Sequence, residues 1–204
     1  FNISAFGSER SCPIEELVIN RNVSAEAVAS TPIRGLASLK KVTIGGACTA
    51  VPTSYFENCT ALETVEIGTS VTEMGTSAFA NTAIASINIH GGIATIPVSC
   101  FKNCTKLTEV ILNDGTTTIS EMAFQNSPVA AVTLPATLTG INTMAFSGCN
   151  LTGDIVIPAQ VTKIANEAFA GNAAITSVSF PASLTNLGEG VFKGCNAITA
   201  YSVD

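Results

Sequence analysis

The chain has 204 residues, of which 47% are hydrophobic and only 12% are charged, and its formal net charge is -6. This composition excludes an intrinsically disordered chain, and no run approaches the roughly 18 apolar residues of a membrane-spanning helix. With Lys+Arg 9 against Asp+Glu 15, the chain lacks the clustered positive charge needed to bind nucleic acid or an anionic membrane surface.

The first 32 residues are the least regular part of the chain. Leu17-Val18-Ile19 predicts the strand of a degenerate first repeat, and Phe6 stands in for the residue that anchors the later repeats. Residues 23–30 are expected to add one helical turn. Terminal repeats are often atypical because they cover the end of the core, so residues 1–32 are interpreted as an N-terminal cap. Since the chain starts at Phe1 without an apolar leader, we expect a mature or trimmed fragment.

From residue 33 onward the sequence repeats a unit of 22 or 23 residues. An anchor residue recurs at Ile33 and then at seven phenylalanines: Phe56, Phe79, Phe101, Phe124, Phe146, Phe169 and Phe192. A fixed period in this range is the signature of a solenoid. Residues 33–204 are therefore predicted to form about eight repeats, which together with the cap make one elongated domain over residues 1–204.

Each unit carries two short apolar patterns. Residues 9 and 11 positions after the anchor, such as Val110 and Leu112, alternate with an outward residue, as in a strand. A second apolar pair lies 8 and 5 positions before the anchor, as in Ile93 and Ile96. Its spacing of three predicts a short extended or 3₁₀ segment on the opposite wall.

The position two residues after the anchor is restricted to asparagine or glycine in seven units: Asn58, Asn81, Asn103, Asn126, Gly148, Gly171 and Gly194. Both residue types tolerate a left-handed backbone, as at the end of a helix, so a short helical turn is expected to end there. The predicted fold is an α/β-type leucine-rich repeat solenoid. It is a right-handed coil with one parallel β-sheet of short strands, opposite a wall of 3₁₀ segments, short helical turns and irregular segments. A parallel β-helix is the structural alternative.

The pattern Leu107-x-x-Val110-x-Leu112, followed by an apolar pair and Ala123-Phe124-x-Asn126-Ser127, resembles the BspA-like leucine-rich repeat family. The resemblance is clear over residues 33–204 and weak over residues 1–32. It implies a secreted or cell-surface protein of a host-associated microbe that adheres to host or extracellular-matrix proteins, and it implies no catalytic residues. A structural spacer that displays another domain and a glycan-binding module are the alternative functions.

The chain has seven cysteines. Four stand three positions after an anchor, in every second unit: Cys59, Cys104, Cys149 and Cys195. Coils stack about 4.8 Å apart, so these cysteines recur at nearly 10 Å, beyond the roughly 7 Å between α-carbons that a disulfide spans. We expect them to be unpaired and buried as small apolar residues, and the same distance argues against a metal column. Pairing of Cys100 with Cys104 is an alternative, and the redox state of Cys12 stays open.

Nothing in the sequence indicates catalysis. His90 is the single histidine, and its place just after a strand predicts a solvent-exposed loop residue. No partner spacing supports a Ser/His/Asp triad that includes it. HExxH, glycine-rich phosphate-loop and CxxC motifs are absent, so we predict no catalytic residues, no cofactor and no metal.

The outward residues of the predicted strands form the candidate partner-binding face. They are Thr64, Glu66, Ser86, Asn88, Glu109, Ile111, Thr133, Asp154, Val156, Ser177 and Ser179. Solenoids bind partners on such extended faces. This one is mildly acidic and lacks the Tyr, Trp and Arg that dominate protein interfaces, so a merely solvated wall is the alternative. The strand that ends at Val203 leaves an open sheet edge, where we expect further chain or end-to-end self-association.

Overall fold

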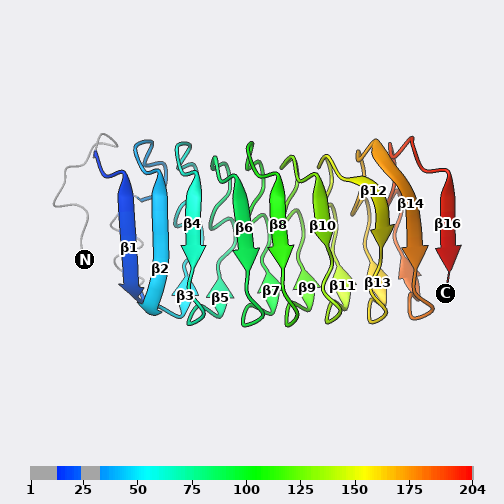
Figure 1. Ribbon diagram of the computed structural model, residues 1–204, viewed down its shortest axis with the longest axis horizontal. Helices are drawn as coiled ribbons and strands as arrows, with labels where there is room; N and C mark the ends of the chain where they lie inside the picture. Colours follow the sequence, from blue (N-terminus) through cyan, green and yellow to red (C-terminus); the bar gives the residue numbers. More distant parts are fainter. Residues whose placement is uncertain (1–12, 24–32, 204) are drawn as a thin grey trace.

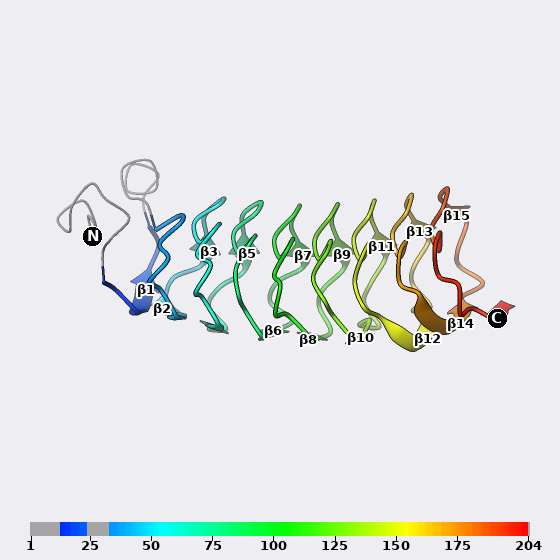
Figure 2. The same cartoon turned by 90° about the horizontal axis from the view of Figure 1, so that it is seen from above.

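The computed structural model describes residues 13–23 and 33–203. They form an elongated stack of coils, with the strands of the N-terminal coils at one end and those of the C-terminal coils at the other (Figure 1). Seen from above, successive coils follow one another along the long axis (Figure 2). Phe6, Cys12 and residues 24–30 of the expected helical turn lie outside the described residues.

The first wall of the stack contains the longer strand of each coil. In chain order these are β1 Glu16–Arg21, β2 Lys41–Ala47, β4 Thr64–Ile67, β6 Ser86–Ile89, β8 Glu109–Leu112, β10 Ala131–Thr133, β12 Thr152–Val156, β14 Ala174–Phe180 and β16 Ala200–Val203 (Figure 1). Their hydrogen-bonded pairs are all parallel. The strand predicted from the alternating pattern is therefore confirmed.

This wall is not the single sheet that the repeat predicts. It consists of three sheets of three strands, in the orders β1-β2-β4, β10-β8-β6 and β12-β14-β16. At the first break Ile84 follows its anchor by five residues whereas Leu62 follows by six, a difference that the paired strands β6 and β8 share. At the second break Gly153, the second residue of β12, is left-handed with φ 72°. One backbone bond still joins the coils at each break, from Ala85 N to Glu63 O and from Thr152 N to Ala130 O.

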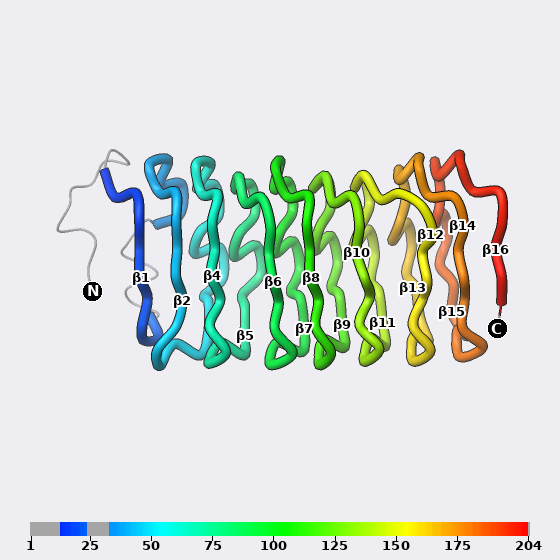
Figure 3. The backbone as a smooth tube through the Cα atoms, in the orientation of Figure 1, coloured from blue at the N-terminus to red at the C-terminus, as the bar shows by residue number. Residues whose placement is uncertain are grey.

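The second wall is also made of strands, each two residues long. They are β3 Ala50–Val51, β5 Glu73–Met74, β7 Thr95–Ile96, β9 Thr118–Ile119, β11 Gly140–Ile141, β13 Lys163–Ile164 and β15 Asn186–Leu187 (Figure 2). The backbone trace of Figure 3 follows those from β5 to β15 along the stack. The last five form one parallel sheet, and β3 pairs with β5. Over residues 13–23 and 33–203 the structure has no helix, so the predicted α/β class and the wall of 3₁₀ and helical turns are wrong.

Hydrogen bonds between coils explain why the second wall consists of strands and not of 3₁₀ segments. Thr117 N and Thr118 N both donate to Ala94 O of the preceding coil, at 2.8 and 3.2 Å. A 3₁₀ segment would instead use its amides for bonds to its own residues three positions back. The spacing of three between the inward residues arises because both residues between them, such as Ala94 and Thr95, face solvent. The fold is thus a β-solenoid with strands on two walls.

The turn around each anchor contains two left-handed positions. The predicted one, two residues after the anchor, is confirmed in all seven units, with φ between 56° and 79°. The other lies two residues before the anchor and has φ between 53° and 62°, at Ser54, Ser77, Ser99, Met122, Met144, Glu167 and Gly190. Left-handed residues four positions apart interrupt any right-handed helix, so the expected helical turn does not form.

Amides in this turn alternate between two kinds of partner. Phe124 N and Asn126 N donate to Ala145 O and Ser147 O of the next coil, both at 2.9 Å, whereas Gln125 N donates to Met122 O within its own turn at 3.1 Å. The same alternation recurs from Phe56 to Phe169. The turn therefore forms a third ladder of bonds between coils, in addition to the two walls.

One of the left-handed positions is a target for stabilisation. Met144 holds φ 54°, a conformation that costs a residue with an ordinary side chain about 1–2 kcal/mol and that asparagine tolerates better. We expect Met144→Asn to raise the free energy of unfolding by about 0.5–1 kcal/mol, measured by urea denaturation. Thr143→Asn, at the neighbouring position without positive φ, is the control, and an equal gain there would contradict this explanation.

The anchor phenylalanines form a single stacked column inside the coils. Adjacent ring centroids from Phe56 to Phe192 are 5.2–5.5 Å apart, with interplanar angles of 4–10°. Phe56 through Phe169 are fully buried. A small buried residue, such as Ala123 or Ala145, precedes most of the rings. The column predicted from the phenylalanine spacing is confirmed, and its rings from Phe56 to Phe169 lie buried inside the stack.

Candidate functional site

The structure gathers the predicted partner-binding residues on the outer side of the first wall. All of them are exposed except Ser177 and Ser179, which are half-buried. Strand register aligns them in two columns, as in Ser86 opposite Glu109 and Asn88 opposite Ile111. We call this surface the strand face.

Near its N-terminal end the strand face neutralises its own charges. Lys41 Nζ lies 2.8 Å from Glu66 Oε1, and Thr43 Oγ1 donates to Glu66 Oε2 at 3.0 Å. The hydrogen bond and charge of Lys41, with the Thr43 hydroxyl, lower the pKa of the Glu66 carboxyl. Lys106 pairs with Glu63 at 2.7 Å. These groups are exposed, so the ion pairs add little stability. The pairs do, however, engage both Lys41 and Lys106 with glutamates of the same chain.

The centre of the strand face is different. Glu109 and Asp154 have no lysine or arginine within ion-pair distance among the described residues. Asp154 Oδ1 instead accepts hydrogen bonds from Ser177 Oγ at 2.6 Å and Thr176 Oγ1 at 3.0 Å, and these bonds lower the pKa of its carboxyl. Ile111 and Val156 are exposed at 44% and 67% on the same strands.

The cysteines after the anchors are buried and free, as predicted. The expectation that they act only as small apolar residues missed their hydrogen bonds. Their thiols point to the anchor carbonyl of the preceding coil, as from Cys104 Sγ to Phe79 O and Cys149 Sγ to Phe124 O, both at 3.2 Å. In two intervening coils Ser127 Oγ and Asn172 Nδ2 make the matching bond, to Phe101 O at 2.6 Å and to Phe146 O at 2.9 Å. Thr82 Oγ1 instead donates to Phe79 O of its own coil. The alternation of Cys with Thr, Ser and Asn was the available signal, because all four side chains can donate. Cys100 and Cys104 are both free, so the alternative disulfide is not formed.

These thiols are expected to be unreactive in the folded protein. Burial raises the pKa of Cys59 and of Cys104 to about 11 and that of Cys149 to about 12, so little reactive thiolate exists near neutral pH. In a Cys12→Ser background, a disulfide reagent at mildly alkaline pH should modify the folded chain very slowly and all six remaining cysteines after denaturation. An added surface thiol, Thr60→Cys, is the control. Rapid modification of Cys59 or Cys104 without unfolding would contradict the burial.

The left-handed asparagines also bond to one another, a contact that was not predicted from their role in the turn. Their carboxamides form a ladder from coil to coil, with Nδ2 donating to the preceding Oδ1 at 2.9, 2.9 and 3.2 Å for Asn81, Asn103 and Asn126. The signal was the recurrence of asparagine at stacked positions of consecutive units. The ladder ends at Gly148, where a side chain would collide with the Asn126 Oδ1.

His90 is half-buried rather than exposed as predicted. Gly92 N donates to His90 Nδ1 at 3.1 Å, so the neutral imidazole carries its proton on Nε2. That Nε2 is buried and has no hydrogen-bond partner in the part of the chain that the structure describes. The ring lies against the backbone of Gly92, which reduces the exposure expected for a loop position. Within residues 13–23 and 33–203, no three His, Cys, Asp or Glu side chains form a group able to hold a metal ion.

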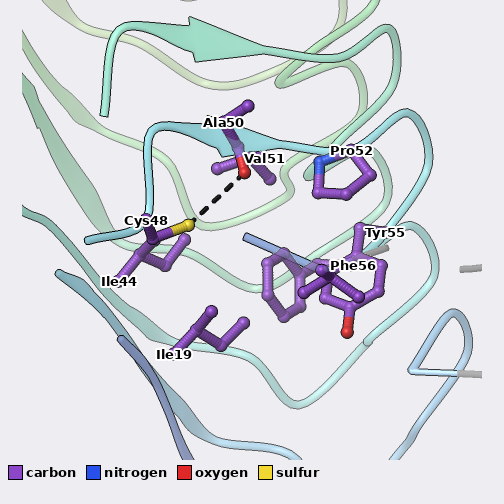
Figure 4. Close-up of a pocket in the computed structure, with 9 residues that line it drawn as sticks. Ile19, Ile44, Cys48, Ala50, Val51, Pro52, Tyr55 and Phe56 are labelled. Atoms are coloured by element: carbon purple, nitrogen blue, oxygen red, sulfur yellow. Dashed lines mark hydrogen bonds between the residues drawn. The ribbon is translucent and has the colours of Figure 1, made fainter. Parts of the chain in front are cut away.

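A small apolar hollow lies at the N-terminal end of the stack. Ile19, Ile44, Val51 and Phe56 are among its lining residues, and Cys48 Sγ donates to Ala50 O at its edge (Figure 4). Its walls expose almost no polar surface and leave no room for a water molecule. It offers neither polar groups nor space to orient a ligand, so the strand face remains the candidate functional site.

The fold and the strand face together define a leucine-rich-repeat type of β-solenoid, in which each complete coil adds one longer and one two-residue strand. The chain belongs to the BspA-type leucine-rich repeat family, whose repeat model matches in six copies over residues 26–152 and 142–203. A comparison with curated proteins found no significant relative.

Two solved structures of bacterial proteins share this fold, and a third is similar in sequence over most of the chain. The pneumococcal vaccine antigen PcpA aligns with a TM-score of 0.63 at 14% identity, over 92% of this chain and 60% of that one. A leucine-rich repeat protein of Bacteroides ovatus aligns with a TM-score of 0.56 at 18% identity, over 92% and 64%. A leucine-rich cell surface protein of Faecalibacterium prausnitzii is 22% identical over 84% and 62%, with a TM-score of 0.47. The chain thus spans about three-fifths of these structures. The described residues include no helix able to cross a membrane.

Proposed function

We propose that this chain is a non-enzymatic recognition or adhesion module of a secreted or cell-surface protein, and that it binds a host or matrix protein through the strand face. One observation carries the proposal. The longer strands lie side by side along the stack (Figure 1), and their outward side chains are exposed from β4 to β12 and half-buried at Ser177 and Ser179 of β14. A similar solved structure is described as a cell surface protein, and another as a vaccine antigen, which supports the location.

The binding test compares two walls of the same molecule. The chain is screened against a panel of host matrix proteins and glycans. Any captured ligand is then measured against Ser86→Arg with Thr133→Arg on the strand face, and against Thr95→Arg with Thr162→Arg on and beside the second wall. All four positions are exposed, and both variants add the same charge. The strand-face variant should weaken binding at least tenfold, and the second-wall variant should not. Equal weakening would contradict binding by this face.

A structural spacer is the second candidate function. The unbroken phenylalanine column and the three ladders between coils suit a stiff rod, and the strand face from β4 to β14 holds no aromatic side chain. If the folded chain bound no member of the panel, the result would favour the spacer over the recognition module. Selective capture of glycans would favour a glycan-binding module instead.

We also propose end-to-end self-association through the edge of β16. Tyr201, Val203 and Leu187 are exposed at 77%, 68% and 53%, whereas most residues at equivalent positions of earlier coils are buried and the others, such as Val132 and Phe180, are partly buried. A strand edge with exposed apolar side chains can pair with another chain. Sedimentation velocity should show association that grows with concentration and is lost in Tyr201→Asp. A constant sedimentation coefficient over the accessible concentrations would contradict this proposal.

A further inference from the structure

Charge on the strand face is distributed in a way that points to the chemistry of its partner. Toward the N-terminal end, Lys41 and Lys106 are held by Glu66 and Glu63. At the centre, the exposed carboxylates of Glu109 and Asp154 have no cation within ion-pair distance among the described residues. Among the described outward residues from β4 to β14, only those at the centre carry negative charge without an ion-pair partner; exposed Glu16, opposite Lys41 on β1, lies outside this part of the face.

The two carboxylates belong to a compact patch on three adjacent strands. Glu109 and Ile111 lie on β8, Ala131 and Thr133 on β10, and Asp154 and Val156 on β12 (Figure 1); we call these six residues the central patch. Register places Glu109 opposite Ala131 and Ile111 opposite Thr133. β10 and β12 belong to different sheets, and the backbone bond from Thr152 N to Ala130 O keeps their coils adjacent. The carboxylates are thus on coils two steps apart in the stack, roughly 10 Å. They flank a small residue and lie beside a row of exposed β-branched side chains.

The Asp154 carboxylate is also held in place. Its Oδ1 accepts two hydroxyl hydrogen bonds, from Ser177 and Thr176. These bonds favour the ionised form and fix one oxygen, while the second oxygen has no hydrogen bond from the described residues. A carboxylate that is oriented before binding loses less entropy when it accepts a cationic donor.

We propose that the central patch binds a cationic segment of a partner protein, in which lysine or arginine alternates with aliphatic residues. The ammonium or guanidinium groups would pair with Glu109 and Asp154. Their methylene stems and the aliphatic neighbours would cover Ile111 and Val156, since long cationic side chains pack their stems on apolar surface. The sign of the charge disfavours nucleic acid and anionic lipid. This inference rests on the proposed use of the strand face and narrows it to one class of partner.

The experiment uses defined peptides as probes. Binding of the whole chain to a synthetic peptide of alternating lysine and valine is measured by calorimetry. Peptides of alternating glutamate and valine, and of lysine and glycine, serve as comparisons. We expect saturable binding of the lysine–valine peptide that weakens as salt rises, with at least tenfold weaker binding of both other peptides. Equal affinity for either of those peptides would overturn the proposal.

Matched variants locate the interaction. Glu109→Gln with Asp154→Asn removes two charges from the central patch. Glu73→Gln with Glu121→Gln removes two charges from exposed positions on β5 and in the turn before Phe124. The first pair of substitutions should weaken binding of the lysine–valine peptide at least tenfold, and the second pair should weaken it less than twofold. Equal losses would show a diffuse effect of net charge and overturn the proposal. Ile111→Ser with Val156→Ser should also weaken binding, and unchanged affinity would exclude the aliphatic contact.

The outcome can be separated from that of the broader proposal. One distinguishing result is a panel protein whose binding is abolished by Ser86→Arg with Thr133→Arg and unchanged by Glu109→Gln with Asp154→Asn. The strand face would then be confirmed as the binding surface, and the proposal that its partner is cationic would be wrong. Circular dichroism of every variant confirms folding, which we expect to be retained because all these side chains are exposed.

Discussion

Phe124→Ala is expected to lower the free energy of unfolding by about 3–5 kcal/mol, the usual cost of truncating a buried phenylalanine. Phe124 is fully buried, and its ring stacks between Phe101 and Phe146 at centroid distances of 5.5 and 5.2 Å. Truncation removes both ring contacts and leaves a cavity in the middle of the column. Because each coil contacts only its neighbours, such a cavity uncouples the two halves of the stack. Denaturant unfolding followed by far-UV circular dichroism measures the loss.

Phe192→Ala is the matched control for this prediction. Phe192 stands at the end of the column, where it stacks on Phe169 and meets the edge of Phe180. It is only partly buried, so its truncation should cost less than that of Phe124 and should leave the remaining coils intact. An equal loss at the two positions would mean that the column does not carry the cooperativity of the stack.

Gly115→Ala is the second change with a large expected effect, a loss of about 3 kcal/mol or more from strain and overpacking combined. Gly115 has φ 117°, which side chains other than glycine rarely adopt. A Cβ atom at this position would fall on the carbonyl oxygen of Gly91 in the preceding coil. Because that obstacle is backbone, relief requires a shift of the whole turn. The midpoint of thermal unfolding measures the cost.

Gly140→Ala provides the comparison. A Cβ atom added at Gly140 has no neighbouring atom within 4 Å, and this residue has no positive φ. The substitution should leave stability within about 0.5 kcal/mol of the parent, as is usual for changes that create no strain or clash. A loss at Gly140 as large as that at Gly115 would show that glycine is needed for a reason other than the close approach of the turns.

Much of the fold follows from the period of the sequence. Phenylalanines at a constant spacing predicted one column, and the alternation of Val110 and Leu112 predicted the strands of the first wall. The restriction to Asn or Gly two residues after the anchor predicted the left-handed backbone there. Each of these features recurs because the same interior position is filled in every coil, and repetition turns a weak local preference into a strong signal.

Other features were not predictable because they depend on bonds between coils. The second left-handed position is filled by residues as different as Met144 and Glu167, so residue type gives no signal. The conformation is instead imposed by the alternating hydrogen bonds of the turn. The second wall was predicted as short extended or 3₁₀ segments, and the sequence did not decide between them for the same reason, since a spacing of three does not reveal that the amides bond to the adjacent coil.

The candidate site was also predictable in part from the sequence. Alternation within each strand was enough to predict which side chains lie on the strand face. It did not predict which charges are neutralised there, because the ion pairs join distant residues. Lys106 reaches Glu63, 43 residues earlier in the chain. The unpaired state of Glu109 and Asp154 is therefore visible only once the coils are stacked.

The three ladders of backbone bonds have a mechanical consequence. Bonds on both strand walls and in the anchor turns connect successive coils along the long axis. A pulling force applied at the two ends would therefore load them lengthwise, and coils would peel off one at a time instead of rupturing together. Each coil of 22 or 23 residues would release roughly 70 Å of extended chain for every 4.8 Å of stack lost. The molecule would then act as an extensible tether that dissipates sudden tension in many small steps.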